Sequence, residues 1–233
     1  MGNGCLLLLA ILLYLNALKR NEPSIVAPFF QSIPIFGFIL SYMILRESLN
    51  YNQILASGLI VIGGLVLSVE TFSGSYRIKK RLLLLMGGSC ILYALNVVIF
   101  KSIAIQQGFL DSLFWDMVGK VMLGLFLFSF IQSYRKQFYY LLKANRLTII
   151  GLNILNEGIA LIGEIALVFA SLFAPITVVQ SVGGLQPAFV FFLGVIFSLL
   201  FPKFSQESLR PNVLVKKLIG IVIISAGAFL INI

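Results

Sequence analysis

Glutamate and asparagine side chains recur on one face of an apolar stretch late in the chain. Asn153, Asn156, Glu157 and Glu164 follow the helical spacing i, i+3, i+4, i+11, which places them on one stripe. A carboxylate near the bilayer centre costs about 3 kcal/mol on insertion scales, and it usually has a partner or faces water. The stripe therefore predicts a cavity wall, with Glu157 as the candidate site for a proton or a substrate charge. Hydrogen bonding between helices without a ligand is the alternative, and for Glu164 the two are evenly balanced.

Lys120 is a cation inside another apolar stretch. Asp116 lies one turn before it, so a local i, i+4 ion pair, or a lysine that extends to the interface, is the simpler explanation. The alternative is an ion pair with Glu157 or Glu164 that breaks and re-forms as the protein changes conformation.

Polar side chains also punctuate three other apolar stretches. They are Ser89, Tyr93 and Asn96, on one helical face; Gln180, followed by Gly183, Gly184 and Pro187; and Gln31, between Pro28 and Pro34. Proline and glycine loosen helical backbone, and freed carbonyls can bind a substrate. We predict Tyr93, Asn96, Gln180 and Gln31 as cavity residues, and close helix packing for Gly183 and Gly184.

Several classes of chemistry are disfavoured. The chain has no histidine, the commonest metal ligand and general base. Cys5 and Cys90 lie inside apolar runs and indicate neither a disulfide framework nor a metal site. The Gly-Gly pairs lack the Lys-Ser/Thr of a phosphate loop. No catalytic residue, metal or cofactor is predicted, and the chain is not expected to be an enzyme.

The elements that position these residues are apolar helices. Of 233 residues, 60% are hydrophobic and 11% charged, with mean hydropathy +1.05, whereas soluble domains average about 25% charged residues. A crossing needs roughly 20 apolar residues. Eight segments qualify: 5–18, 24–45, 53–69, 82–100, 113–131, 147–172, 175–201 and 218 to the C-terminus. We predict an all-α membrane protein with about eight transmembrane helices and no soluble domain.

Lysine and arginine gather in alternate connections between these segments. The basic connections hold Lys19 and Arg20; Arg77, Lys79, Lys80 and Arg81; Arg135, Lys136, Lys143 and Arg146; and Lys203, Arg210, Lys216 and Lys217. The opposite connections hold only Arg46 and Lys101. The positive-inside rule then places both termini outside and explains the net charge of +9 without a nucleic-acid partner.

The order of motifs repeats within the chain. Pro34, an apolar span, Glu47-Ser-Leu and a Gly-rich span are followed later by Pro187, an apolar span, Glu207-Ser-Leu and a second Gly-rich span. Internal repeats interrupted by proline and glycine are typical of secondary transporters.

At these residues the chain resembles the EamA-type branch of the drug/metabolite transporter superfamily, over nearly its whole length. The resemblance implies two inverted five-helix repeats around a central substrate cavity. Residues 1–69 would be a truncated first repeat of three helices, 70–81 a basic connecting loop, and 82–233 a complete second repeat. Two helices of the first repeat have no counterpart. Family members usually keep both termini in the cytoplasm; the charges indicate the opposite, and we adopt the orientation that the charges give.

The expected function is secondary transport or export of small metabolites, amino-acid-like or amphiphilic, by alternating access. The expected location is the plasma (inner) membrane. The expected partners are the lipid bilayer, a small-molecule substrate and a coupled proton. Eight helices would leave part of the polar stripe facing lipid, so a homodimer or two further N-terminal helices should cover it. The alternatives are an intramembrane enzyme acting on lipid or isoprenoid substrates, and a non-transporting fragment or subunit.

Overall fold

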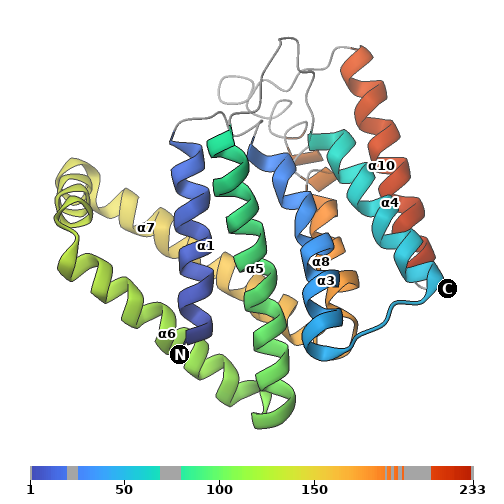
Figure 1. Ribbon diagram of the computed structural model, residues 1–233. Coiled ribbons are helices and arrows are strands. Elements are labelled where there is room, and N and C mark those ends of the chain that lie inside the picture. The colour runs from blue at the N-terminus through green and yellow to red at the C-terminus, as the bar shows by residue number, and fades with distance from the viewer. Residues whose placement is uncertain are drawn as a thin grey trace.

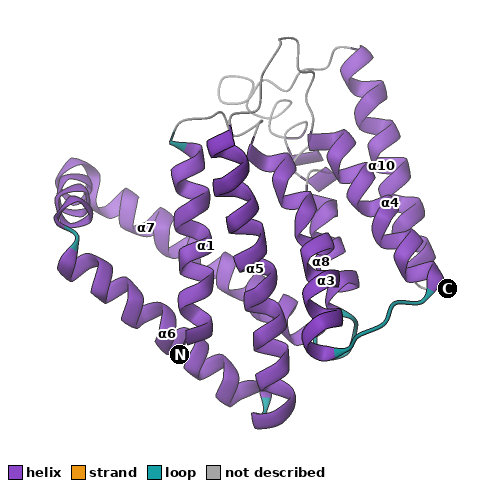
Figure 2. Ribbon diagram, viewed as in Figure 1, coloured by secondary structure: helices purple, strands orange, loops and turns teal. Residues whose placement is uncertain are grey.

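The computed structural model describes residues 2–19, 26–68, 80–186, 188–189, 192–193, 196 and 211–231. Helices make up its regular structure, and these residues contain no strand (Figure 2). In chain order the elements are α1 (Gly2–Leu18), the 3-10 helix η1 (Ala27–Ser32), α3 (Ile33–Leu45), α4 (Tyr51–Ser68), α5 (Lys80–Gln107), α6 (Phe109–Phe130), α7 (Gln132–Ala170), α8 (Ile176–Ser181), the 3-10 helix η2 (Val182–Leu185) and α10 (Pro211–Ile231).

The helical stretches agree with the predicted segments. Three described helices are long and apolar enough to cross a membrane: Lys80–Gln107, Phe109–Phe130 and Ile150–Ala170. Five shorter apolar stretches accompany them: Gly2–Leu18, Phe29–Leu45, Tyr51–Val66, Ile176–Leu185 and Leu218–Leu230. Each of the eight overlaps one predicted segment, which confirms the prediction of an all-α membrane protein.

Two expected connections are corrected. The loop expected between the fifth and sixth segments is helical, and Ile131 alone separates α6 from α7. Residues 132–150 contain no proline or glycine, so nothing ends the helix there. Similarly, α5 continues until Gly108, whose φ of 94° stops it. Lys101 is therefore inside α5, and was wrongly assigned to a connection.

Other sequence predictions fall on segments outside the described residues. These are most of the basic connection at 70–81, the second half of the seventh segment with Pro187, and the Glu207-Ser-Leu motif. The division of the chain into two repeats stays a prediction.

Helix α5 is the centre around which neighbouring helices pack. Helices α1 and α3 lie along it, and α8 packs on α3 (Figure 1). Val97 and Val98 of α5 form a buried cluster with Ile176, the first residue of α8. Helices α4 and α10 pack along one another, where Gly63 and Gly227 let the two backbones approach.

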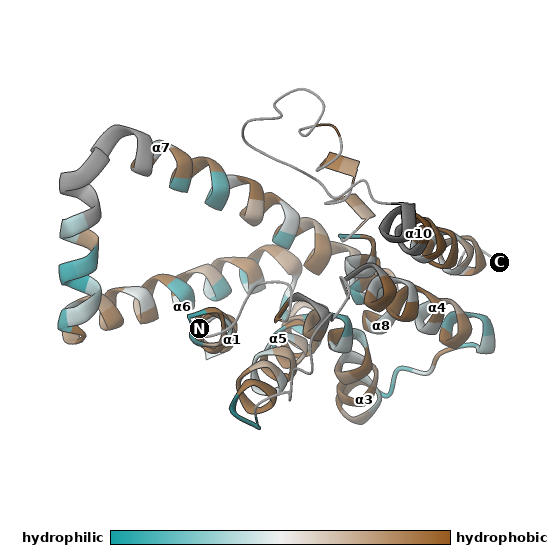
Figure 3. Cartoon of the chain, turned by 90° about the horizontal axis from the view of Figure 1, so that it is seen from above, coloured by the Kyte–Doolittle hydropathy of each residue, from teal (hydrophilic) through white to brown (hydrophobic). Residues whose placement is uncertain are grey.

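Helices α6 and α7 form a limb that reaches away from this packed group. Seen from above, they diverge from the other helices and meet at their far corner (Figure 3). Every residue from 150 to 163 in α7 is exposed, whereas Val168, near the end of α7, is buried. Among the described residues, α6 packs on α1 and α5, whereas α7 contacts the packed group mainly near its end.

Candidate functional site

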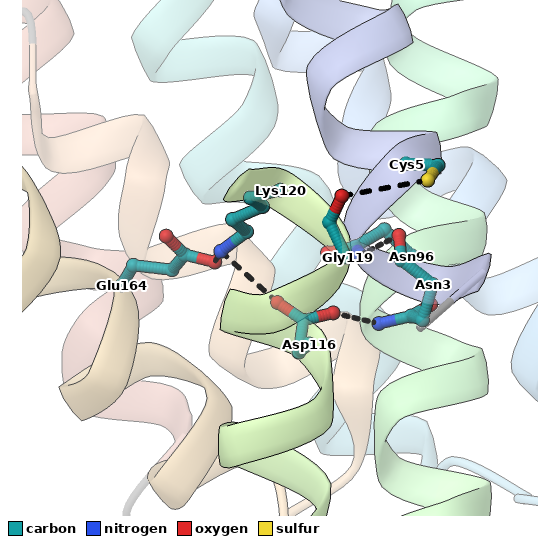
Figure 4. Close-up of polar contacts among 7 residues, drawn as sticks. All are labelled: Asn3, Cys5, Asn96, Asp116, Gly119, Lys120 and Glu164. Atoms are coloured by element: carbon teal, nitrogen blue, oxygen red, sulfur yellow. Dashed lines mark hydrogen bonds and ion pairs between the residues drawn. The ribbon is translucent and has the colours of Figure 1, made fainter. Parts of the chain in front are cut away.

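A network of charged and amide groups lies where the limb meets the packed group. Lys120 of α6 pairs with Asp116, one turn earlier at 3.0 Å, and also with Glu164 of α7 (Figure 4). The Asn3 side chain of α1 donates a hydrogen bond to Asp116 Oδ1 at 2.6 Å. Lys120 therefore pairs with Asp116 as the simpler interpretation expects and also with Glu164, while the breaking and re-forming of the second pair stays a prediction.

The network continues through backbone contacts to a fourth helix. Asn96 of α5 donates its side-chain N–H to the Asn3 carbonyl at 2.9 Å. Gly4 packs directly on the backbone carbonyl of Asp116, where a Cβ would collide with it. Because Gly4 permits this close approach, Asn3 reaches the carboxylate. Helices α1, α5, α6 and α7 thus meet at one polar centre.

The charges of this centre do not balance. One ammonium, on Lys120, lies between two carboxylates, on Asp116 and Glu164. The Asp116 side chain is only 3% exposed and that of Glu164 is 24% exposed, so the second carboxylate is the more accessible. Helices α6 and α7 are therefore joined through one cation that two anions share.

A second ion pair ties α3, α5 and α8 together. Glu47, in the corner after α3, pairs with Lys101 of α5 at 2.5 Å. Glu47 also accepts a hydrogen bond from the Ile176 backbone N–H at 3.0 Å, and Lys101 donates to the Ala174 carbonyl at 2.8 Å. Both side chains are thus bonded to each other and to the turn that begins α8.

Two glutamines are buried in the segments 24–45 and 175–201, which the sequence predicts to be counterparts in the two repeats; α3 and α8 of these segments contact one another. Gln31 of η1 and Gln180 of α8 are each 5% exposed. The Gln180 amide rests against Gly37 of α3, where any side chain would occupy its place. Neither amide atom of Gln180 has a hydrogen-bond partner within the described structure. An unpaired buried amide is available to a neutral hydrogen-bonding group.

The other predicted site residues are distributed over the fold. Asn153, Asn156 and Glu157 lie in the exposed part of α7, and one copy of the chain does not enclose them. Their place in a cavity stays a prediction. Tyr93 is half-buried beside the Val97–Val98 cluster, and Asn96 bonds α1 rather than facing open space.

The sequence analysis missed three polar residues that the structure brings into these networks. Asn3 lies in a polar N-terminal flank with no recognisable motif. Glu47 was noted only as part of a repeated motif, and its partner Lys101 was assigned to a loop. Lysine within an otherwise apolar run is the signal that could have drawn attention to Lys101.

Residues 4–69 match the EamA-like transporter family, a region that contains α1, η1, α3 and α4. Over this part, less than a third of its length, the chain is similar to that family. The apolar helices make it an all-α membrane protein. No curated protein matches the chain. The Glu47–Lys101 pair joins the matched region to α5, which follows it.

The described residues contain no group of three or more metal-ligating side chains of the kind that holds an ion. The polar centres described above are made of ion pairs and amides.

Proposed function

We propose that this protein is a secondary transporter or exporter of small metabolites that works by alternating access. The observation that supports this most is the Asp116–Lys120–Glu164 network, which joins α6 to α7 inside apolar helices. Intramembrane ionisable groups are costly and usually serve ion or substrate pathways. We assign the activity to the plasma (inner) membrane, with no cofactor.

The shared lysine offers a way to couple charge to movement. Asp116 lies on the same helix as Lys120, whereas Glu164 lies on another, so protonation of Glu164 would weaken only the link between α6 and α7. Glu164 is thus our first candidate for proton coupling. Glu157 is the second, because it is a carboxylate on an apolar stretch with no ion pair among the described residues, and it lies in the exposed part of α7.

The buried amides support a substrate class. Gln31 and Gln180 are neutral donors and acceptors, and the Gln180 amide has no partner among the described groups. Uncharged polar groups of an amino-acid-like or amphiphilic solute would satisfy them. Asn153, Asn156, Tyr93 and Asn96 are retained as secondary candidates for substrate contact.

The test is solute counterflow and proton-driven uptake in liposomes, comparing Glu164→Gln with Glu157→Gln. We expect Glu164→Gln to abolish the pH dependence of uptake while solute exchange persists, and Glu157→Gln to retain it. Loss of pH dependence in Glu157→Gln alone would reassign coupling to that residue. Turnover of a lipid by the purified protein, without solute flux, would contradict transport and favour the intramembrane-enzyme alternative.

A further inference from the structure

Helix α1 begins, and α3 and α5 end, at the lower end of the bundle in Figure 1. The Glu47–Lys101 pair follows α3 and belongs to the last turns of α5, so it lies at that end. Its surroundings are restricted: Lys101 is 7% exposed as a residue, and the Glu47 side chain is 15% exposed. Helix α1 ends and α5 begins at the opposite end, next to Lys19 and Lys80, and the positive-inside rule predicts that this end is cytoplasmic. The pair is then on the outer side.

Each charge of the pair is matched to a backbone group of one short turn. The carboxylate accepts from the Ile176 N–H, and the ammonium donates to the Ala174 carbonyl. The polarity is therefore specific: an anion is required beside the N–H and a cation beside the carbonyl. An ion pair that only neutralised charge would not need these backbone partners.

The turn controls where α8 begins. Helix α8 has six residues, and it continues into the 3-10 turn η2 through Gly183 and Gly184. So short a helix has few bonds of its own. Its N-terminal attachment to Glu47 and Lys101 acts together with the burial of its residues to fix its position against α3 and α5. Gln180 lies within this helix, one turn beyond the attachment.

We propose that Glu47 and Lys101 form a latch that closes the outer end of the pathway by holding the start of α8 against α3 and α5. The inference rests on the proposed transport function. Opening the latch requires both backbone bonds and the ion pair to break together, which frees α8 and exposes its buried face to water.

The test measures water access to α8 directly. Ser181, fully buried on α8, is replaced by cysteine in a background with Cys5→Ala and Cys90→Ala. The full chain in liposomes is labelled with a water-soluble maleimide. Ser89→Cys on α5, also buried, is the matched reporter away from the latch. Variants at 47 and 101 are then compared with the parent.

Lys101→Met should raise the labelling rate at position 181 by about tenfold or more, since each 1.4 kcal/mol lost from the closed state multiplies the open population by ten. Glu47→Gln keeps an acceptor for the Ile176 N–H and should raise it less. The rate at position 89 should not change. Glu47→Gln keeps the hydrogen bond from the Ile176 N–H, so its labelling rate at position 181 decides the test if Lys101→Met does not fold.

The exchanged pair, Glu47→Lys with Lys101→Glu, separates a latch from simple charge neutralisation. It restores the ion pair but places a cation at the N–H and an anion at the carbonyl, so labelling should remain fast. Labelling at the parent rate in the exchanged pair, or an unchanged rate in Glu47→Gln, would overturn the latch. Counterflow is measured separately: a parent that labels as expected but moves no solute contradicts only the proposed function.

Discussion

Two parts of this protein are held in different ways. In α5, 44% of the most apolar stretch is buried, whereas in residues Ile150–Ala170 of α7 only 6% is buried. The packed group around α5 is held by interdigitated apolar side chains such as Val97, Val98 and Ile176. The limb of α6 and α7 is held to it by the Lys120 network and by a smaller apolar cluster at its base, in which Phe100 and Ala104 of α5 pack on Val168 of α7. Burial therefore fixes the first part, whereas the second combines a small apolar contact with ion pairs.

The largest effect should come from removing the shared cation. Lys120→Met leaves Asp116 buried without its ammonium partner, and breaking a buried pair in this way costs about 3 kcal/mol or more. For a chain of this size we expect the unfolding midpoint in detergent, followed by circular dichroism, to fall by roughly 6–12 °C. Lys80→Met, at an exposed cation, is the control. Equal midpoints in both variants would show that the network does not stabilise the limb.

The close approach of α1 to α6 gives the next effect. Gly4→Leu places a side chain on the Asp116 carbonyl and should cost about 1–3 kcal/mol by overpacking. Thermal unfolding measures it. Gly158→Leu is the matched control because a Cβ there meets no other atom within 4 Å. A similar loss in the control would remove the distinction between the packed region and the limb.

The exposed part of α7 should associate with a second copy of the chain. Asn156 and Glu157 are exposed there beside apolar residues such as Leu155 and Ile159, and lipid satisfies polar groups poorly. We expect a dimer by light scattering in mild detergent, and a cross-link through Ile159→Cys in a background with Cys5→Ala and Cys90→Ala. A stable, transport-active monomer would contradict this prediction.

The smallest effect on stability should come from Glu157. Glu157→Gln changes a side chain that other described helices do not cover, so the expected change in unfolding free energy is within about 0.5 kcal/mol. The same substitution at Glu164 should cost more, because it breaks an ion pair. Chemical denaturation of both variants measures the difference. A larger loss of unfolding free energy in Glu157→Gln would show that another molecule covers this part of α7, which is exposed in a single copy.

The sequence predicted the eight apolar segments because length and hydropathy are local properties. It missed the helical path of residues 132–146, since basic residues were taken as the mark of a loop although no residue there breaks a helix. The length of α5 was underestimated for a related reason: Lys101 is charged but inside the helix.

The site was predicted only where helical spacing determines it. The Asp116–Lys120 pair follows from i, i+4 spacing within one helix. Contacts between helices, such as those of Asn3 with Asp116 and of Glu47 with Lys101, depend on crossings that periodicity does not specify. The stripe of α7 was predicted as a continuous face, and the contact of Glu164 with Lys120 of another helix could not be read from its spacing.

The local pairing of Lys120 with Asp116 has a consequence for how the chain enters the membrane. A helix that carries an ion pair one turn apart inserts as a nearly neutral unit, since each charge offsets the insertion cost of the other. Helix α6 can thus be integrated before α7 is synthesised. Glu164 enters later, when its cationic partner Lys120 is already in the bilayer. The order of the helices along the chain therefore lets an ammonium donor that is already in the membrane help to position the least buried of the three candidate spans.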